Sequence, residues 1–215
     1  MTSVFEAFGS LGIVPVLEIE QEEQAVPTAL ALAAGGLPAA EVTLRTPAAL
    51  GSIRRIAAQA PGVLVGAGTV LTLEQARAAR DAGAQFLVAP GLAPAVVAWA
   101  LEQGIPVLPG VMTPSEITAA LGLGLNLLKF FPAEPLGGVR TIEAMSDPFP
   151  GLRFIPTGGI RPENIAVYLR SPRILAVGGS WMARRAAIRA GQFEQIETLT
   201  RQAVDAVREA RAARV

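Results

Sequence analysis

Short apolar runs alternate with longer amphipathic stretches along most of the chain. Most runs end at or next to a glycine, a proline or a polar residue, and the stretch behind each is rich in Ala and Leu at helical spacing. Eight runs have this form and are predicted to be strands: 13–19, 40–45, 64–70, 86–90, 106–111, 126–132, 153–158 and 174–179. Segments 24–34, 73–82 and 93–103 are predicted to be helices, because each combines this spacing with a glycine directly behind it.

The strands recur at intervals of roughly 20 to 27 residues, the length of one strand, one helix and two loops. Several are apolar on both faces, as parallel strands covered by helices should be. Eight such units with no second domain left over predict a single-domain (β/α)8 TIM barrel over residues 1–215. A doubly wound open sheet is the alternative. A short helix at 2–8 and an amphipathic helix at 192–214 flank the repeat, and Thr113 with Glu116 forms a structural capping box.

The composition limits the compartment and the partners. Although 51% of the residues are hydrophobic, Gly, Pro or a charge interrupts every run before the ~20 apolar residues that a membrane helix needs. Residues 1–12 carry no basic side chain, which argues against a secretory signal, and we expect a cytoplasmic protein. Eighteen acidic and 18 basic side chains give no net charge, which argues against nucleic acid or an anionic membrane as a partner.

The chain contains no histidine and no cysteine. These absences exclude a Ser-His-Asp triad, a cysteine nucleophile, a disulfide and a zinc site built from the usual nitrogen and sulfur ligands. Covalent or acid-base chemistry must therefore use lysine, carboxylates, hydroxyls or the one tyrosine, Tyr168. Lys129 is the only lysine, against 17 arginines, and it stands between Leu128 and Phe130 in the run 126–132.

This lysine is the strongest candidate for chemistry in the chain. Unlike arginine, lysine can lose its proton, and apolar surroundings favour the neutral amine, which attacks carbonyl carbon. The position of Lys129 in an apolar strand therefore predicts imine chemistry. The alternative is a lysine at the end of the strand whose charged group reaches water.

The strand at 40–45 carries an acid and an arginine at alternate positions. A period of two places Glu41, Thr43 and Arg45 on one face of the strand, and Val42 and Leu44 on the other. Because the apolar pair must face the helices, the three polar side chains are predicted to point into the barrel. Buried charges are unfavourable unless they are paired or used, so a structural pair between Glu41 and Arg45 is the alternative to a catalytic acid.

The same alternation in 126–132 places Leu127, Lys129 and Phe131 inside the barrel. Lys129 and Glu41 should therefore share one cavity, at the carboxyl ends of the strands where barrels gather their working residues. A neighbouring carboxylate favours the ammonium form, whereas a neighbouring cation such as Arg45 and burial favour the neutral amine. The sequence alone leaves the protonation state of this amine open.

Paired glycines end the last two predicted strands. Gly158 and Gly159, and then Gly178 and Gly179 with Ser180 behind them, expose backbone N–H groups where phosphate-binding barrels commonly hold that group. We expect a phosphate site there, with plain tight turns as the alternative.

With these residues laid out, the chain resembles the 2-keto-3-deoxy-6-phosphogluconate (KDPG) aldolase family, which also includes 4-hydroxy-2-oxoglutarate aldolases. The resemblance rests on motifs in the family's order: EVTLRT at 41–46, GAGTV at 66–70, PG at 90–91, KFFPAE at 129–134, PTGGI at 156–160 and GGSW at 178–181. Together they are highly specific and cover the chain from about Val14 to Gly191. The main departure is Ala89, where relatives often carry serine.

The resemblance implies a role for each candidate residue. Lys129 would be the Schiff-base lysine and Glu41 the general acid/base, while Arg45 and Thr69 would hold the substrate carboxylate. The pyruvate pocket would be lined by Pro90, Phe131 and Thr157, and the phosphate would be held by Gly158, Gly159, Gly178, Gly179 and Ser180. The family further implies a homotrimer of (β/α)8 barrels that uses no metal and no cofactor and acts on a small-molecule 2-keto acid.

The implied activity is class I aldol cleavage. The substrate would be KDPG, which gives pyruvate and D-glyceraldehyde 3-phosphate, or 4-hydroxy-2-oxoglutarate, which gives pyruvate and glyoxylate, or both. The sequence leaves open the choice among these and the galactonate epimer, because pocket geometry distinguishes the configuration of one hydroxyl. One alternative is a phosphate-binding barrel isomerase or synthase with Glu41 as base and Lys129 as an electrostatic clamp. Another is a barrel that binds or assembles without catalysis.

Overall fold

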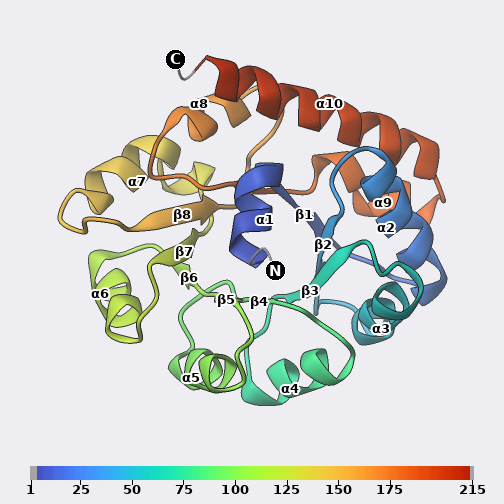
Figure 1. Ribbon diagram of the computed structural model, residues 1–215, viewed down its shortest axis with the longest axis horizontal. Helices are drawn as coiled ribbons and strands as arrows, with labels where there is room; N and C mark the ends of the chain where they lie inside the picture. The colour runs from blue at the N-terminus through green and yellow to red at the C-terminus, as the bar shows by residue number, and fades with distance from the viewer. Residues whose placement is uncertain (1–3, 214–215) are drawn as a thin grey trace.

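The computed structural model describes residues 4–213, and its strands and helices alternate around a ring with α1 at the centre (Figure 1). The strands are β1 (Ile13–Leu17), β2 (Ala39–Thr43), β3 (Leu64–Gly68), β4 (Leu87–Val88), β5 (Val107–Leu108), β6 (Gly110–Val111), β7 (Leu127–Phe130), β8 (Arg153–Pro156) and β9 (Val177–Gly179). The α-helices are α1 (Val4–Leu11), α2 (Ala25–Ala34), α3 (Ala49–Gln59), α4 (Leu73–Asp81), α5 (Pro94–Glu102), α6 (Pro114–Gly122), α7 (Gly138–Ser146), α8 (Ile165–Arg170), α9 (Arg185–Arg189) and α10 (Phe193–Ala212). Short 3-10 helices lie in the loops: η1 (Glu22–Gln24), η2 (Glu134–Leu136) and η3 (Trp181–Ala183).

The described strands pair in parallel, so the predicted α/β fold with a parallel sheet is confirmed. One sheet has the order β5-β4-β3-β2-β1-β9, and the other has the order β6-β7-β8. Isolated bridges from Phe154 to Ile174 and from Thr157 to Gly178 connect β8 to the segment that contains β9. The predicted strand 106–111 is divided into β5 and β6 at Pro109, which has no N–H to donate to a neighbouring strand.

An apolar cluster fills the inside of the ring. It is formed by Phe8, Val14, Ala39, Phe86, Val88, Leu108, Leu127, Ile155 and Ala176. Phe8 of α1 packs edge-on against Phe86, with ring centroids 4.9 Å apart. Leu64 and Leu175, which stand at the amino end of β3 and just before β9, pack against the same cluster. Helix α1 therefore covers the amino end of the ring, and the carboxyl ends of the strands are left for a site.

The two flanking helices form close to their predicted positions. Helix α1 spans Val4–Leu11 instead of 2–8, and residues 2 and 3 lie outside the described part of the chain. Helix α10 spans Phe193–Ala212 instead of 192–214, and residue 214 also lies outside it. Helix α10 packs along α8 and α2 (Figure 1).

The capping box at the start of α6 is confirmed. The Thr113 hydroxyl accepts a hydrogen bond from the Glu116 N–H, and the Glu116 carboxylate accepts one from the Thr113 N–H. Both polar groups serve the helix end, so this motif is structural as predicted. Among the helices of residues 4–213, none has the length and apolar composition needed to cross a membrane.

Candidate active site

A cavity of about 210 Å³ lies at the carboxyl ends of the strands. The twelve residues singled out from the sequence all line it: Glu41, Arg45, Thr69, Pro90, Lys129, Phe131, Thr157, Gly158, Gly159, Gly178, Gly179 and Ser180. Val16, Thr43 and Ile160 complete the lining. Residues that are far apart in the sequence meet here because parallel strands all end at the same edge of the ring.

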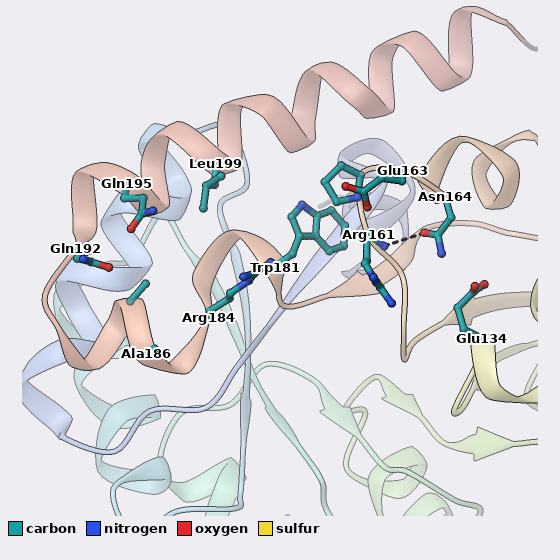
Figure 2. Close-up of a pocket in the computed structure, with 12 residues that line it drawn as sticks. Glu134, Arg161, Glu163, Asn164, Trp181, Arg184, Ala186, Gln192, Gln195 and Leu199 are labelled. Atoms are coloured by element: carbon teal, nitrogen blue, oxygen red, sulfur yellow. Dashed lines mark hydrogen bonds between the residues drawn. The ribbon is translucent and has the colours of Figure 1, made fainter.

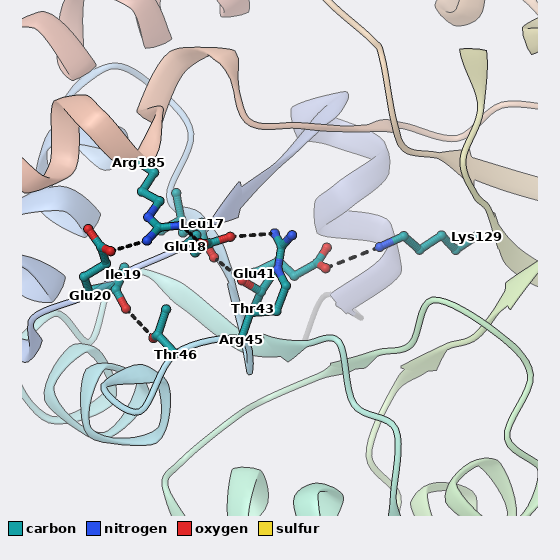
Figure 3. A network of polar contacts seen from close by, with 10 residues as sticks. All are labelled: Leu17, Glu18, Ile19, Glu20, Glu41, Thr43, Arg45, Thr46, Lys129 and Arg185. Atoms are coloured by element: carbon teal, nitrogen blue, oxygen red, sulfur yellow. Dashed lines mark hydrogen bonds and ion pairs between the residues drawn. The ribbon is translucent and has the colours of Figure 1, made fainter. Parts of the chain in front are cut away.

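Lys129 and Glu41 form a buried pair across this cavity. Lys129 is the third residue of β7 and Glu41 the third of β2, and the Lys129 Nζ donates a hydrogen bond to Glu41 Oε1 at 3.4 Å (Figure 3). Their side chains are 7% and 4% exposed, so the prediction of one shared cavity is confirmed and a lysine that reaches bulk water is excluded. The Nζ also lies 5.4 Å from the centroid of the Phe131 ring.

Two glycines in β3 leave room for Glu41 and for the inner apolar cluster. A side chain at Gly68 would collide with Glu41, because a Cβ there would lie 2.7 Å from the Glu41 Cγ and 2.9 Å from its Cδ. A Cβ at Gly66 would run into the Phe86 ring. The glycines of the GAGT stretch therefore leave the space that the Glu41 carboxylate and the inner apolar cluster occupy.

Arg45 departs from the prediction. Strand β2 ends at Thr43, so the alternation of the strand does not extend to Arg45, and its side chain is 51% exposed at the mouth of the cavity. Arg45 Nη2 pairs with Glu18 Oε2 at 3.3 Å, and a structural pair between Glu41 and Arg45 is not what the structure shows. Thr43 does point inward, and its hydroxyl donates to the Leu17 carbonyl of β1 at 2.8 Å.

Thr69 has an unusual backbone conformation. Among the described residues it is the non-glycine residue with a positive φ, at 59°. A β-branched residue in this left-handed region is strained by roughly 1 to 2 kcal/mol. Thr69 follows β3 directly and lines the cavity, so the strain is located in the cavity wall, as strained backbone often is at functional sites.

The two glycine pairs face the cavity opposite β3. Gly158 and Gly159 have φ values of 107° and 82°, which glycine adopts without strain. At Gly178 a Cβ would lie 3.0 Å from Thr157 Cγ2 and nearer still to the Thr157 hydroxyl. Ser180 follows β9 and is exposed. Backbone therefore forms this wall of the cavity, the glycine wall, and backbone N–H groups are donors of the kind that anion sites use.

A chain of charged groups extends from α9 to the mouth of the cavity (Figure 3). Arg185 Nη1 donates to Glu18 Oε1 at 2.6 Å, and its Nη2 donates to Glu20. The hydrogen bond between Arg185 and Glu20 lowers the pKa of Glu20 and raises the pKa of Arg185. The sequence interpretation did not include Glu18, Glu20 or Arg185. The alternation of Glu18, Ile19 and Glu20 after β1 was the only local signal for this network.

Tyr168 lies outside the cavity. Its ring is buried between α8 and η2, and its hydroxyl donates to the Glu134 carboxylate. Burial and this carboxylate together raise the pKa of Tyr168 well above its ordinary value. The one tyrosine of the chain is therefore a structural group and takes no place beside Lys129.

A larger cavity, of about 770 Å³, lies outside the ring between α10, α9 and the loop before α8 (Figure 2). Arg161, Arg184 and Trp181 are among its lining residues, and Lys129 and Glu41 are not. Within residues 4–213, no three His, Cys, Asp or Glu side chains stand together as possible ligands of a metal ion. The groups that the smaller cavity offers a ligand are an amine, a carboxylate, a guanidinium, hydroxyls and backbone N–H groups.

This set of groups suits covalent capture of a carbonyl compound. A buried amine can add to carbonyl carbon, and a carboxylate within 3.4 Å can move the protons that the addition and the following bond cleavage require. Arg45 and Thr69 can hold a carboxylate at one side of the reacting carbon. The glycine wall can hold a second anion at the other side of that carbon.

Comparison with known proteins gives consistent results. The family model for KDPG and KHG aldolase matches residues 5–199. The 2-dehydro-3-deoxy-phosphogluconate aldolase of Treponema pallidum is 47% identical over 207 residues, which cover 96% of this chain and 99% of the relative. The KHG/KDPG aldolase of Escherichia coli K12 is 46% identical over 193 residues, which cover 90% of this chain and 91% of the relative.

A solved structure is similar over nearly the whole chain. The KDPG aldolase of Legionella pneumophila, with pyruvate captured at low pH as a covalent carbinolamine intermediate, matches with a TM-score of 0.89. The two sequences are 39% identical, and the match covers 93% of this chain and 97% of that one.

Proposed function

The chain belongs to the KDPG and KHG aldolase family, and we propose from its cavity which residues carry out the reaction and on which substrates. It is a class I aldolase, a carbon-carbon lyase. An enzyme of this class holds its keto substrate as an imine on a lysine. Lys129 is the lysine available, and its buried nitrogen 3.4 Å from Glu41 is the observation that supports the proposal most strongly.

The reaction begins with the addition of neutral Lys129 Nζ to the C2 carbonyl of a 2-keto acid. Loss of water from the carbinolamine gives an iminium that can accept an electron pair. Glu41, directly or through a water, takes the proton of the C4 hydroxyl as the C3–C4 bond breaks and the aldehyde leaves. The enamine that remains is protonated at C3, and hydrolysis releases pyruvate and restores Lys129.

The remaining residues of the cavity hold the substrate. Arg45 and Thr69 bind its carboxylate, and Pro90, Phe131 and Thr157 enclose the three carbons that become pyruvate. The phosphate of KDPG is held by the glycine wall: Gly158, Gly159, Gly178, Gly179 and Ser180. The positive φ values of Gly158 and Gly159 support this assignment, because both residues line the cavity in a conformation that favours glycine and so present backbone without a side chain.

The substrates are KDPG and 4-hydroxy-2-oxoglutarate, the latter also called 2-keto-4-hydroxyglutarate (KHG). The relatives carry names with one or both activities. A steady-state comparison of KDPG with the same compound lacking its phosphate measures how much the phosphate contributes. If the glycine wall binds phosphate, kcat/KM for KDPG should exceed that for the substrate without phosphate.

Trapping with borohydride tests the imine. Native protein treated with pyruvate and borohydride should lose activity irreversibly and gain the mass of reduced pyruvate on Lys129. Lys129→Met should gain no mass and have no activity, although it stays folded. Activity without an adduct would instead favour an isomerase or synthase in which Glu41 is the base and no imine forms. Retained function in Lys129→Met would favour a barrel that acts without catalysis.

The finer architecture is also part of the proposal. We propose that the two sheets form one closed (β/α)8 barrel and that residues 1–215 are a single domain. The division at Pro109 and the bridges between β8 and the β9 segment support closure. A cytoplasmic homotrimer is proposed as well. Leu101 of α5 and Leu121 of α6 are exposed apolar side chains that support self-association, and light scattering of the purified protein measures the mass of the assembly.

A further inference from the structure

Four charged side chains alternate in sign between α9 and the cavity: Glu20, Arg185, Glu18 and Arg45. They come from distant parts of the sequence, because Glu18 and Glu20 follow β1, Arg45 follows β2, and Arg185 begins α9. Figure 3 shows the row leading from Arg185 through Glu18 to Arg45, with Glu41 and Lys129 on the far side of Arg45. Each inner member of the row has a partner on both sides, so the row forms one connected unit.

Glu18 contacts Arg45 from behind. Arg45 lines the cavity and Glu18 does not, so the carboxylate holds the guanidinium on the side away from a substrate. Arg45 is long, flexible and 51% exposed, whereas Glu18 is only 20% exposed. A guanidinium has five N–H donors, so its contact with Glu18 leaves other donors for a ligand.

Arg185 in turn holds Glu18. Its hydrogen bond to Glu18 Oε1 measures 2.6 Å, shorter than the 3.3 Å between Glu18 Oε2 and Arg45. Glu18 is therefore fixed mainly by Arg185. The positive charge of Arg185 also offsets the negative charge of Glu18. The positive charge of Arg45 therefore stays available for a substrate carboxylate.

We propose that Glu18 is a positioning residue for Arg45 and that Arg185 acts only through Glu18. The inference rests on the proposed role of Arg45 as the group that holds the substrate carboxylate. The contacts from Arg185 through Glu18 to Arg45 connect α9 to the binding of the keto acid. Arg45 is then fixed before the substrate arrives, and binding does not have to immobilise its side chain.

Positioning and charge predict opposite results when Glu18 is removed. Immobilising a flexible side chain weakens binding by roughly three- to tenfold. Removal of a partly exposed negative charge near an anion site improves anion binding by about threefold or less, because Arg185 already offsets the charge and water and salt screen the remainder. If positioning dominates, a variant without the Glu18 carboxylate binds the keto acid more weakly. If charge dominates, it binds the keto acid more tightly.

The experiment uses pyruvate, which has the carboxylate and the keto group but no phosphate. The rate of borohydride trapping on Lys129 is measured against pyruvate concentration in the full-length native protein, Glu18→Ala, Arg185→Ala and the double variant. We expect a three- to tenfold rise in the half-saturating pyruvate concentration for Glu18→Ala, with the maximal rate within about twofold of native. Arg185→Ala should show a smaller rise, and the double variant should equal Glu18→Ala.

A matched control comes from another exposed ion pair. Glu23 and Arg55 lie 3.2 Å apart and do not line the cavity, so Glu23→Ala and Arg55→Ala should leave the half-saturating concentration unchanged. Glu18→Gln, which keeps the size of the side chain, is measured beside Glu18→Ala in case the smaller residue disturbs the fold. It should show a rise in the same direction.

Three results would overturn the inference: a lower or unchanged half-saturating concentration in both Glu18 variants, a fall in maximal rate alone, or a further rise in the double variant. Failure of the proposed function looks different. Native protein without any adduct on Lys129 would remove the imine and this inference with it. A native adduct with unchanged pyruvate dependence in the Glu18 variants would remove this inference alone.

Discussion

Gly68→Ala tests whether the position of Glu41 controls the reaction. Gly68 ends β3 beside Thr43 of β2, and a Cβ there would lie 2.7 Å from Glu41 Cγ and 2.9 Å from Cδ. Carbon atoms need roughly 3.5 Å or more, so the carboxylate must move by about 1 Å. A misplacement of that size at a reacting group lowers catalysis by about 100-fold. We therefore expect kcat/KM to fall about 100-fold, which corresponds to about 2.7 kcal/mol of transition-state stabilisation.

The assay separates this effect from loss of the fold. The displaced atoms belong to a flexible side chain, so the free energy of unfolding should fall by no more than about 3 kcal/mol, the range of overpacked cores. The variant should still form the pyruvate adduct, because Lys129 keeps its place. Gly62→Ala is the control, since a Cβ there meets no atom within 4 Å. Native kcat/KM in Gly68→Ala would show that the carboxylate has no critical position.

Two further substitutions test other parts of the structure. Tyr168→Phe should flatten the loss of stability above pH 10. The raised pKa of Tyr168 keeps its hydroxyl protonated in the folded state while the unfolded state ionises. The contribution of Tyr168 to the free energy of unfolding is therefore complete below pH 10 and falls by up to about 1.4 kcal/mol per pH unit above it. Absorbance at 295 nm measures the ionisation of the tyrosine, and urea unfolding measures the free energy. Thr69→Gly should lower kcat/KM by about 10- to 100-fold through the lost hydroxyl, while the free energy of unfolding changes by less than about 1 kcal/mol, because relief of strain offsets glycine's entropy. Thr69→Ser should keep most of the activity, and an equal loss there would contradict the role of the hydroxyl.

The sequence predicts the strands well because buried parallel strands are short apolar runs with abrupt ends. Lys129 and Glu41 were placed correctly, since both stand inside regular strands where alternation holds. Arg45 lines the cavity as predicted but is half exposed instead of buried, because it lies two residues beyond the end of β2. The apolar pattern predicts one continuous strand over 106–111, whereas Pro109 in its middle removes a donor and divides it into β5 and β6.

The network of Glu18 and Arg185 could not be predicted from spacing. Glu18 and Arg185 are 167 positions apart, and neither lies in a strand. Only the folded ring brings the end of β1 beside the start of α9. Groups that support a site from behind are defined by tertiary contacts, whereas groups that line it are defined by strand ends, and only the second kind leaves a local pattern.

The layers inside the ring explain why an amine and a carboxylate can be kept dry at this position. Along β7, Leu127 belongs to the inner apolar cluster, Lys129 stands one inward position higher, and Phe131 lines the cavity above it. On β2, Ala39 and Glu41 repeat the same order. Because α1 and Phe8 cover the amino end, the open side of the pair is the cavity at the carboxyl ends of the strands. Burying an amine and a carboxylate is unfavourable unless their polar groups are paired, and the 3.4 Å contact between Lys129 and Glu41 supplies that pairing until a ligand enters the cavity.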